Sequence, residues 1–251
     1  MKNLKNLIIA IILIIILYFI YNYYNQENFG MTSADILTSK DTLDILRKML
    51  KDTHAILTAK HIQYWIDGGT LLGAVRHKNI IPWDDDADIV ITEKDKQKFL
   101  SLRRIFYKFG YGIVRFWGGF KIFPLNGKPI KHTNRNWHWS ENSKRIEDRE
   151  IFNYKYPFID VFFAKKYGNI FHFSNKYSKK IFNKFYHEAK DLYPLKEYTF
   201  DDFKLIGPNN PKPYLDRGYG DDHMTTGYKS YDHQNMSFLP IVKFKVEPVR
   251  D

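Results

Sequence analysis

The stretch from Tyr64 to Thr92, which reads YWIDGGTLLGAVRHKNIIPWDDDADIVIT, constrains this chain more than any other. It starts with a short apolar strand that ends in a Gly-Gly-Thr turn and opens a helix. A glycine turn at a helix start presents backbone N–H groups to an anion. An acidic run follows and leads into a second apolar strand, and carboxylates are oxygen ligands suited to Mg²⁺. Together the two signals predict a site that binds a phosphate through backbone amides and a metal ion.

The acidic run predicts a pair of metal ligands on one face of a strand. Side chains two residues apart in a strand point the same way, so Asp86 and Asp88 are expected to share a face. Asp84 has the same parity, but Pro82 leaves its direction open. Neighbouring carboxylates repel one another unless a cation neutralises them. A solvated turn is the alternative interpretation.

An EF-hand calcium loop is disfavoured for the same acids. Its sixth position requires Gly, where this chain has Ile89, and its twelfth requires a bidentate Glu, where this chain has Asp95. The apolar residues that follow Asp88 also predict a strand and not a loop.

A single acid, Asp160, lies in the apolar segment FIDVFFA at 158–164. Burial of an unpaired carboxylate is costly, so Asp160 requires a partner. That partner is either an Arg or a backbone cap, or the same metal ion, with Asp160 as third ligand. A general base acting on an acceptor hydroxyl is a further role for it.

The residues around the glycine turn supply candidates for substrate binding. Gly68 and Gly69 let the backbone approach a ligand closely, and Thr70 adds a hydroxyl; an ordinary tight turn is the alternative. Arg76 either neutralises phosphate charge or caps the short helix. Trp83 either stacks on a base or sugar or belongs to the core.

The periodicity of the chain predicts an α+β fold. Helices are expected at 41–61, 69–77, 92–110 and 177–190 and near 214–217, and the third of these has an inward stripe of Phe99, Leu102, Phe106 and Phe109. Strands are expected at 62–67, 87–91, 111–117, 119–124, 158–164, 170–173 and 198–206. Residues 125–150 are expected to be an irregular excursion, and the end of the chain a loose tail.

Residues 7–20 are uninterrupted hydrophobic residues after two lysines. With the flanking tyrosines the stretch is long enough to span a bilayer, so an uncleaved membrane anchor at 1–24 is favoured over a cleaved signal peptide. A stalk at 25–40 and a catalytic domain at 41–251 would follow. The lysines predict a cytoplasmic N-terminus and a catalytic domain on the lumenal or extracytoplasmic side.

The composition favours anionic partners and excludes thiol chemistry. The formal charge is +11 and is spread along the chain, which favours nucleotides or phosphorylated glycans, and no nucleic acid is expected. The chain contains no cysteine, so disulfides and Cys-ligated zinc are excluded.

Three segments resemble the LicD/fukutin-related family. They are GGTLLGAVRHKNIIPWDDDADI, FIDVFF around Asp160, and PKPYLDRGYGDD at 211–222, in the family's order along residues 45–222. The resemblance implies a nucleotidyltransferase-like fold, a mixed β-sheet flanked by helices. It also implies transfer of a phospho-alcohol, such as phosphocholine or ribitol phosphate, from a CDP-linked donor to a glycan hydroxyl.

The resemblance assigns roles to the candidate residues. Gly68, Gly69 and Thr70 would hold the donor phosphates, and Arg76 would contact the pyrophosphate. Mg²⁺, or Mn²⁺ in its place, would be carried by Asp86 and Asp88, with Asp84 or Asp160 completing the set. A nucleotidyltransferase that leaves the nucleotide on its acceptor, and a non-catalytic glycan-binding or nucleotide-binding module, remain as alternatives.

Overall fold

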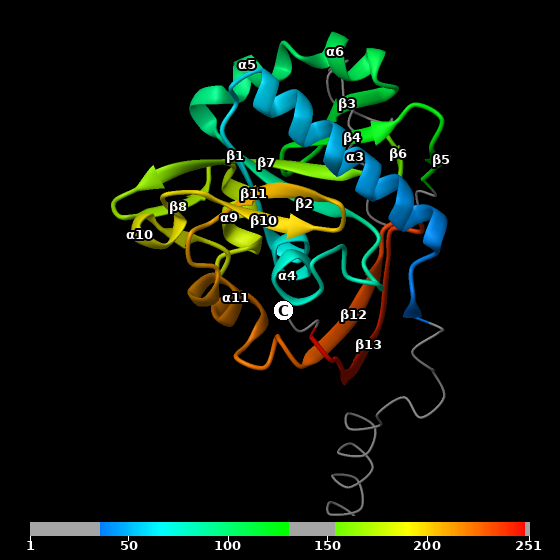
Figure 1. Ribbon diagram of the computed structural model, residues 1–251, viewed down its shortest axis with the longest axis vertical. Helices are drawn as coiled ribbons and strands as arrows, with labels where there is room; N and C mark the ends of the chain where they lie inside the picture. Colours follow the sequence, from blue (N-terminus) through cyan, green and yellow to red (C-terminus); the bar gives the residue numbers. More distant parts are fainter. Residues whose placement is uncertain (1–35, 131–153, 249–251) are drawn as a thin grey trace, which may run out of the picture. The chain divides into compact units, whose positions relative to one another are not determined.

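A mixed seven-stranded β-sheet organises the fold (Figure 1). The computed structural model describes residues 36–130 and 154–248. The main path of the sheet runs β1-β2-β7-β4-β3, and β8 and β9 extend it from β7. The strands in this order are β1 (Tyr64–Ile66), β2 (Ala87–Thr92), β7 (Ile159–Tyr167), β4 (Phe120–Pro124), β3 (Tyr111–Arg115), β8 (Ile170–Phe173) and β9 (His187–Glu188).

The parallel pair β2 and β7 forms the centre of the sheet. Asp88 on β2 is in register with Asp160 on β7. Strand β1 pairs antiparallel with β2, and β4 pairs antiparallel with β7. Parallel strands are covered on both faces and are therefore almost continuously apolar. This explains the runs ADIVIT and IDVFFA, in which the acids are the exceptions.

Helix α3 (Lys40–Ala59) runs obliquely across the sheet (Figure 1). Ser39 at its N-cap accepts a hydrogen bond from the backbone N–H of Thr42 at 3.3 Å, which satisfies one donor of the first turn. Its buried residues recur with helical period: Leu46, Met49, Leu50, Thr53, Ile56 and Leu57. The helix predicted at 41–61 is therefore confirmed.

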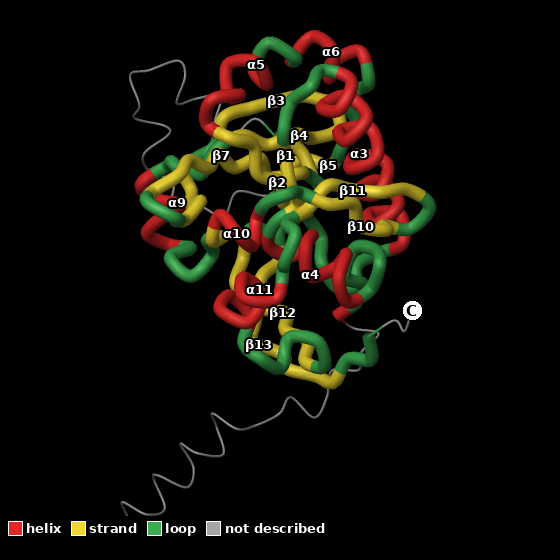
Figure 2. Tube along the Cα trace, turned by 60° about the vertical axis from the view of Figure 1, so that its left-hand side comes forward, coloured by secondary structure: helices red, strands yellow, loops and turns green. Residues whose placement is uncertain are grey.

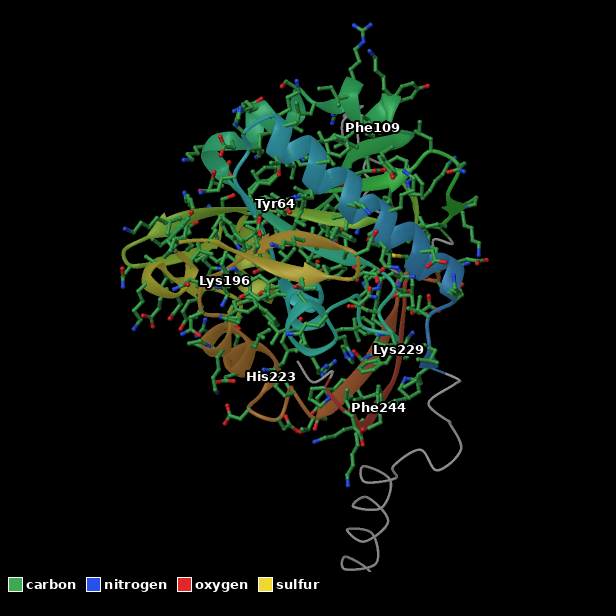
Figure 3. The ribbon with its side chains drawn as sticks, viewed as in Figure 1. Tyr64, Phe109, Lys196, His223, Lys229 and Phe244 are labelled. Carbon is green, nitrogen blue, oxygen red and sulfur yellow. The ribbon has the colours of Figure 1, made fainter. Side chains whose placement is uncertain are left out.

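The helix predicted at 92–110 is divided into a 3₁₀ turn (Glu93–Asp95), α5 (Lys96–Leu100) and α6 (Arg103–Lys108). The break follows α5, where the Ser101 hydroxyl donates to the carbonyl of Lys98 and competes with the helical hydrogen bonds. Phe99, Leu102 and Phe106 are buried as predicted. Phe109 is 50% exposed, so its predicted inward position is wrong, and Figure 3 shows it at the outer side of the molecule.

Two predictions for the region after residue 176 are wrong. The helix predicted at 177–190 is only α9 (Lys176–Ile181), followed by a loop, β9 and α10 (Ala189–Leu192). The strand predicted at 198–206 is a hairpin of β10 (Lys196–Phe200) and β11 (Phe203–Gly207). Asp201 in its turn has φ +56°, the left-handed conformation that a tight turn requires.

The predicted loose tail is also a hairpin, of β12 (Thr226–Asp232) and β13 (Ser237–Lys245). Most of its residues are exposed or half-buried, so the apolar alternation that marks a strand is weak. Helix α11 (Lys212–Tyr219) precedes it and confirms the helix predicted near 214–217. Figures 1 and 2 both place α5 and α6 at one end of the described fold and α11 with the β12–β13 hairpin at the other.

Of the excursion predicted at 125–150, only residues 125–130 belong to the described part of the chain. Its start forms β5 (Lys128–Pro129), which pairs with β6 (Lys155–Tyr156). Residues 131–150 lie outside the described part of the chain.

The predicted N-terminal transmembrane helix, and with it the single-pass membrane location, requires correction. Among the helices of the described residues, none is long and apolar enough to cross a membrane. The longest described helix, α3, has 20 residues but carries seven charged side chains in the sequence KDTLDILRKMLKDTHAILTA. Residues 1–24 and most of the predicted stalk at 25–40 lie outside the described residues.

Phe99 provides a test of the helix-to-sheet packing. Its fully buried ring lies 6.0–6.3 Å from the rings of Phe106, Phe120 and Phe163. Phe99→Ala is expected to lower the free energy of unfolding by about 3–5 kcal/mol because it leaves a cavity. Phe109→Ala, in the same helical segment, is the matched control and should cost less than about 1 kcal/mol. Urea denaturation measures both, and equal losses would contradict this packing.

Candidate active site

Three carboxylates converge at the centre of the sheet. Asp88 and Asp160 are neighbours in the parallel register of β2 and β7, and Asp86 directly precedes β2. One oxygen from each of the three lies within 4.8 Å of the other two. This spacing lets all three bind one cation. The predicted grouping of Asp86, Asp88 and Asp160 therefore exists in space, and their role as ligands stays a prediction.

The glycine turn lies directly against these acids. Gly68 opens helix α4 (Gly68–Arg76) with φ +51°, a conformation that favours glycine. A Cβ on Gly68 would lie 2.5 Å from Oδ2 of Asp88, and a Cβ on Gly69 would lie 2.4 Å from Oδ2 of Asp84. Any larger residue would displace a carboxylate. The two glycines thus bring the start of α4 and the acids into contact.

The carboxylates lie where negative charge is disfavoured. Burial, followed by repulsion from Asp86 and Asp160, raises the pKa of Asp88 well above its ordinary value. Burial likewise raises the pKa of Asp86 well above its ordinary value, although the charge of His233 opposes the shift. Burial and the charge of Asp85 raise the pKa of Asp84 to about 6. The site is therefore short of positive charge, which a bound cation would supply.

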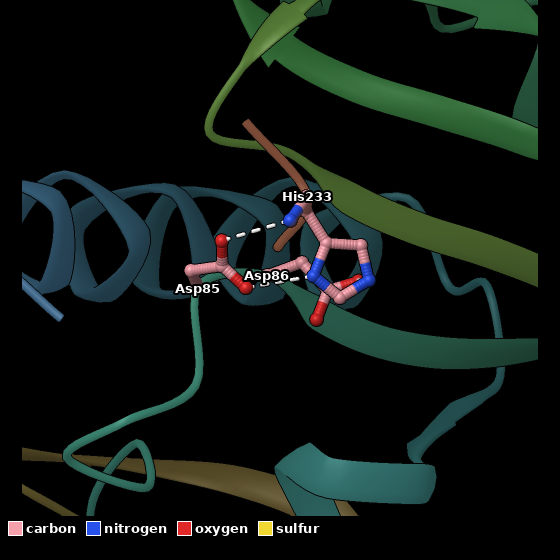
Figure 4. Close-up of side chains that lie close together, drawn as sticks. All are labelled: Asp85, Asp86 and His233. Atoms are coloured by element: carbon pink, nitrogen blue, oxygen red, sulfur yellow. Dashed lines mark hydrogen bonds and ion pairs between the residues drawn. The ribbon is translucent and has the colours of Figure 1, made fainter. Parts of the chain in front are cut away.

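His233, in the turn between β12 and β13, contacts two acids of the run (Figure 4). Its Nδ1 lies 2.7 Å from Oδ1 of Asp85, and its backbone N–H donates to Oδ2 of the same residue at 3.1 Å. Its Nε2 lies 3.2 Å from Oδ2 of Asp86. Burial lowers the pKa of His233, but the charge of Asp86 and the hydrogen bond to Asp85 outweigh it and raise the pKa to about 10.

Lys121 on β4 forms an ion pair with Asp160. Its Nζ lies 2.5 Å from Oδ1 of Asp160, and both side chains are buried. The ammonium also lies over the rings of Phe158 at 3.4 Å, Phe116 at 4.5 Å and Tyr154 at 5.0 Å. Aromatic faces stabilise a desolvated cation. The partner of Asp160 in this structure is thus a lysine, whereas an Arg, a backbone cap or a metal ion was expected.

Asp84 and Asp85 are set apart from the central three. Asp84 accepts a hydrogen bond from the backbone N–H of Asp85 at 3.1 Å and lies against Gly69. Among the described residues, one cluster that could hold a metal contains Asp86, Asp88 and Asp160, and another contains Asp85, Asp86 and His233; Asp84 belongs to neither. Asp160 is therefore better placed than Asp84 to complete the set.

Thr70 has a partner other than a ligand. Its Oγ1 accepts a hydrogen bond from the backbone N–H of Asp88 at 2.7 Å. The hydroxyl thereby joins the first turn of α4 to the start of β2. Its O–H proton is still able to donate to a ligand, so its predicted phosphate contact stays a prediction.

Arg76 and Trp83 hold the C-terminal segment against the site. The Nη1 of Arg76 donates to the carbonyls of His223 at 2.5 Å and Thr226 at 2.9 Å, and burial lowers the pKa of Arg76 to about 10. Trp83 donates through Nε1 to the carbonyl of Tyr228 at 3.0 Å, and its ring meets Phe244 edge-on at 4.6 Å. Figure 3 labels His223 beside the loop that follows α11 and Phe244 on the β12–β13 hairpin. The substrate contacts predicted for Arg76 and Trp83 remain predictions.

A cavity of about 710 Å³ adjoins these groups, with the exception of Thr70. Asp67, the two glycines and the acids form its polar part. Aromatic residues from five segments form much of the rest, namely Phe116, Trp117, Phe162, Phe182, Tyr219 and Tyr228. Arg76 and Trp83 also line it. This volume falls within the usual range for small-molecule sites and suits a nucleotide-sized ligand.

Several residues of the site were not predicted. Lys121 is a lone cation in the apolar strand FKIFP, and the cost of burying it without a partner was a usable signal. Asp67 directly precedes the glycine turn, where an N-cap residue is expected. His233 carried no such signal, because it lies in a segment without clear periodicity.

Similar proteins match parts of this chain. An uncharacterised protein of Rickettsia typhi is 35% identical over 175 residues, which is 69% of this chain and 45% of that protein. Lipopolysaccharide cholinephosphotransferase LicD of Haemophilus influenzae is 38% identical over 66 residues, 26% of this chain and 25% of LicD. Human ribitol 5-phosphate transferase FKRP is 45% identical over 61 residues, 24% of this chain and 12% of FKRP. The chain thus matches about half or less of the length of these relatives.

A longer match identifies the family of this chain. Residues 61–210 match the LicD/FKTN/FKRP nucleotidyltransferase domain, and this range includes the glycine turn, the acidic run and the β7 strand that carries Asp160. The named relatives LicD and FKRP both transfer phosphate-containing groups. The chain belongs to the LicD/FKTN/FKRP nucleotidyltransferase-domain family.

Proposed function

We propose that this chain transfers a phospho-alcohol from a CDP-linked donor to a hydroxyl of a glycan, with a divalent cation as cofactor. The observation that carries the proposal is the convergence of Asp86, Asp88 and Asp160 within 4.8 Å, next to a glycine turn and a cavity of about 710 Å³. The relatives that transfer cholinephosphate and ribitol 5-phosphate support this class of group.

The donor set fits Mg²⁺ or Mn²⁺. It consists of carboxylate oxygens alone, which hard divalent cations prefer. Burial and repulsion from neighbouring aspartates raise the pKa values of Asp86 and Asp88, and a bound cation would offset the negative charge of both carboxylates. Asp86, Asp88 and Asp160 would hold the ion, which when bound offsets charge on the diphosphate.

The residues of the chain would mainly position the reactants. The amides of Gly69 and Thr70 have no acceptor within helix α4 and would bind phosphate oxygens. The acceptor oxygen forms a bond to the distal phosphorus while the bond from that phosphorus to the bridging oxygen breaks. CMP leaves, and the hydroxyl proton passes to a carboxylate of the cavity. Such transfer depends on alignment and fixed charge more than on covalent chemistry.

A donor screen tests this function. The purified protein is incubated with CDP-choline, CDP-ribitol or CDP-glycerol and a glycan acceptor, with and without Mg²⁺. Mg²⁺-dependent release of CMP is expected with one of the donors. A nucleotidylated acceptor would indicate the alternative nucleotidyltransferase reaction. Donor binding without any turnover would indicate a non-catalytic module.

Substitution of the central acids tests the metal assignment. Loss of a residue that only supports a metal ligand costs about 10–100-fold, so Asp86→Asn or Asp88→Asn should lower kcat by at least about 100-fold. The backbone should stay intact, because Asn preserves the side-chain shape. Circular dichroism checks the fold and CMP release measures turnover.

The control for these two variants is Asp202→Asn. Asp202 is an exposed acid in the turn between β10 and β11, and it pairs with Lys51 of α3. Its turnover should equal that of the wild type. Wild-type turnover by Asp86→Asn or Asp88→Asn would contradict the assignment.

Lys121→Met tests the competition between the lysine and the cation for Asp160. Removal of one partner of a buried ion pair leaves an uncompensated charge and should cost about 3–5 kcal/mol of stability in the metal-free protein. A cation would then replace the missing charge. Mn²⁺ should therefore raise the melting temperature of the variant more than that of the wild type and bind it about tenfold more tightly.

The matched control here is Lys51→Met, which removes the lysine of an exposed ion pair with Asp202 and should not alter Mn²⁺ affinity. Weaker Mn²⁺ binding by Lys121→Met would show that the lysine supports the cation site and does not compete with it.

A further inference from the structure

We infer that Asp67, His187 and Tyr214 form a buried clamp that fixes the glycine turn against the carboxylates and so positions it for the transfer reaction. The inference rests on the proposed function for its catalytic consequence. It assigns a role to the segment PKPYLDRGYGDD, of which the family match, ending at residue 210, includes none.

Asp67 has an unusual set of partners for a residue at a helix start. It is the N-cap of α4, yet its side chain makes no capping hydrogen bond to that helix. Its side chain is 5% exposed, and Oδ1 lies 2.9 Å from Nε2 of His187 on β9. An N-cap Asp ordinarily accepts from its own first turn. Here the carboxylate instead joins α4 to a strand 120 residues later.

Besides the pairing of its backbone with β8, His187 is hydrogen-bonded through its side chain to Asp67 and packs against two rings. It is 3% exposed, and its Nδ1 has no hydrogen-bond partner among the described residues. Its imidazole stacks on Tyr214 with ring centroids 4.1 Å apart and an interplanar angle of 1°. Trp65 meets it edge-on at 6.3 Å. The contacts with Tyr214 and Trp65 therefore orient the imidazole so that Nε2 points toward Asp67.

Tyr214 on α11 completes the clamp by contacting the turn itself. Its hydroxyl accepts a hydrogen bond from the backbone N–H of Gly68 at 3.1 Å. Burial, followed by the charge of Asp67, raises the pKa of Tyr214 well above its ordinary value, so the proton stays on the phenol. The side chain is 2% exposed.

The clamp controls both the position of the turn and the donors that it offers. Gly68 is pressed against Asp88 in a left-handed conformation, and its N–H is already used by Tyr214. The first-turn amides left for a ligand are thus those of Gly69 and Thr70. Displacement of His187 or Tyr214 would leave the Asp67 carboxylate or the Gly68 N–H buried without this partner, which is costly. Shifting Tyr214 would shift the amides relative to the acids.

The test compares two buried tyrosines. Tyr214→Phe removes only the hydroxyl that binds Gly68, whereas Tyr198→Phe removes the hydroxyl that donates to the carbonyl of Pro208 at 2.6 Å, in the β10–β11 region. Tyr214→Phe should lower kcat for CMP release by about 10–100-fold with little change in the KM of the acceptor. Tyr198→Phe should leave kcat unchanged, and both melting temperatures should be recorded.

A second pair of variants tests His187. In His187→Gln the amide nitrogen is able to donate to Asp67, so this variant should retain more activity than His187→Leu, which has no donor. Equal activity of the Gln and Leu variants, or equal loss in Tyr214→Phe and Tyr198→Phe, would overturn the clamp.

Amide exchange separates the clamp from the proposed function. By NMR, the N–H of Gly68 should exchange at least about tenfold faster in Tyr214→Phe than in the wild type, because its acceptor is lost. Unchanged exchange would overturn the clamp even if the wild type is a transferase. If the wild type releases no CMP from any donor, the proposed function fails, and the exchange at Gly68 still decides whether the clamp exists.

Discussion

The parallel pairing of β2 with β7 places Asp88 beside Asp160, and much of the surrounding structure follows from the need to tolerate these closely spaced charges. Two carboxylates in register in a sheet interior repel each other and lose hydration. The chain offsets the problem in part. Lys121 reaches Asp160 from the next strand, and His233 reaches Asp86 from the β12–β13 hairpin. The remaining excess of negative charge is what makes the site suited to a cation.

Lys121 and His233, the two basic residues that contact the acids, are positioned by different parts of the fold. Lys121 is delivered by sheet register, since β4 pairs with β7 and sets Lys121 opposite Asp160. His233 is delivered by a hairpin that lies beyond residue 210, where the family match ends. Arg76 and Trp83 bind this C-terminal segment through backbone carbonyls, so residues near the glycine turn also anchor the hairpin that completes the site.

A comparable division holds on the other side of the glycine turn. Thr70 links α4 to β2 through the N–H of Asp88, which is a contact between segments that are close in sequence. Tyr214 links the same turn to α11, 146 residues away. The turn is therefore held both by the nearby strand β2 and by the distant helix α11. Rigid support of this kind is what a site that acts through positioning requires.

The sequence by itself determined the features that depend on local geometry. These are the strand parity that aligns Asp86 with Asp88, the glycine turn that opens α4, the apolar runs of β2 and β7, and the buried face of α3. Strand and helix periods act over a few residues, so a pattern is enough to predict them. The hairpin at 226–245 escaped prediction because its half-exposed strands carry little alternation. Only the tertiary structure decided that Lys121 pairs with Asp160, that His233 reaches Asp85 and Asp86, and that Tyr214 holds Gly68. Those contacts join residues 39 to 148 positions apart, and side-chain pairing over such separations is set by how the elements pack, which no local pattern specifies.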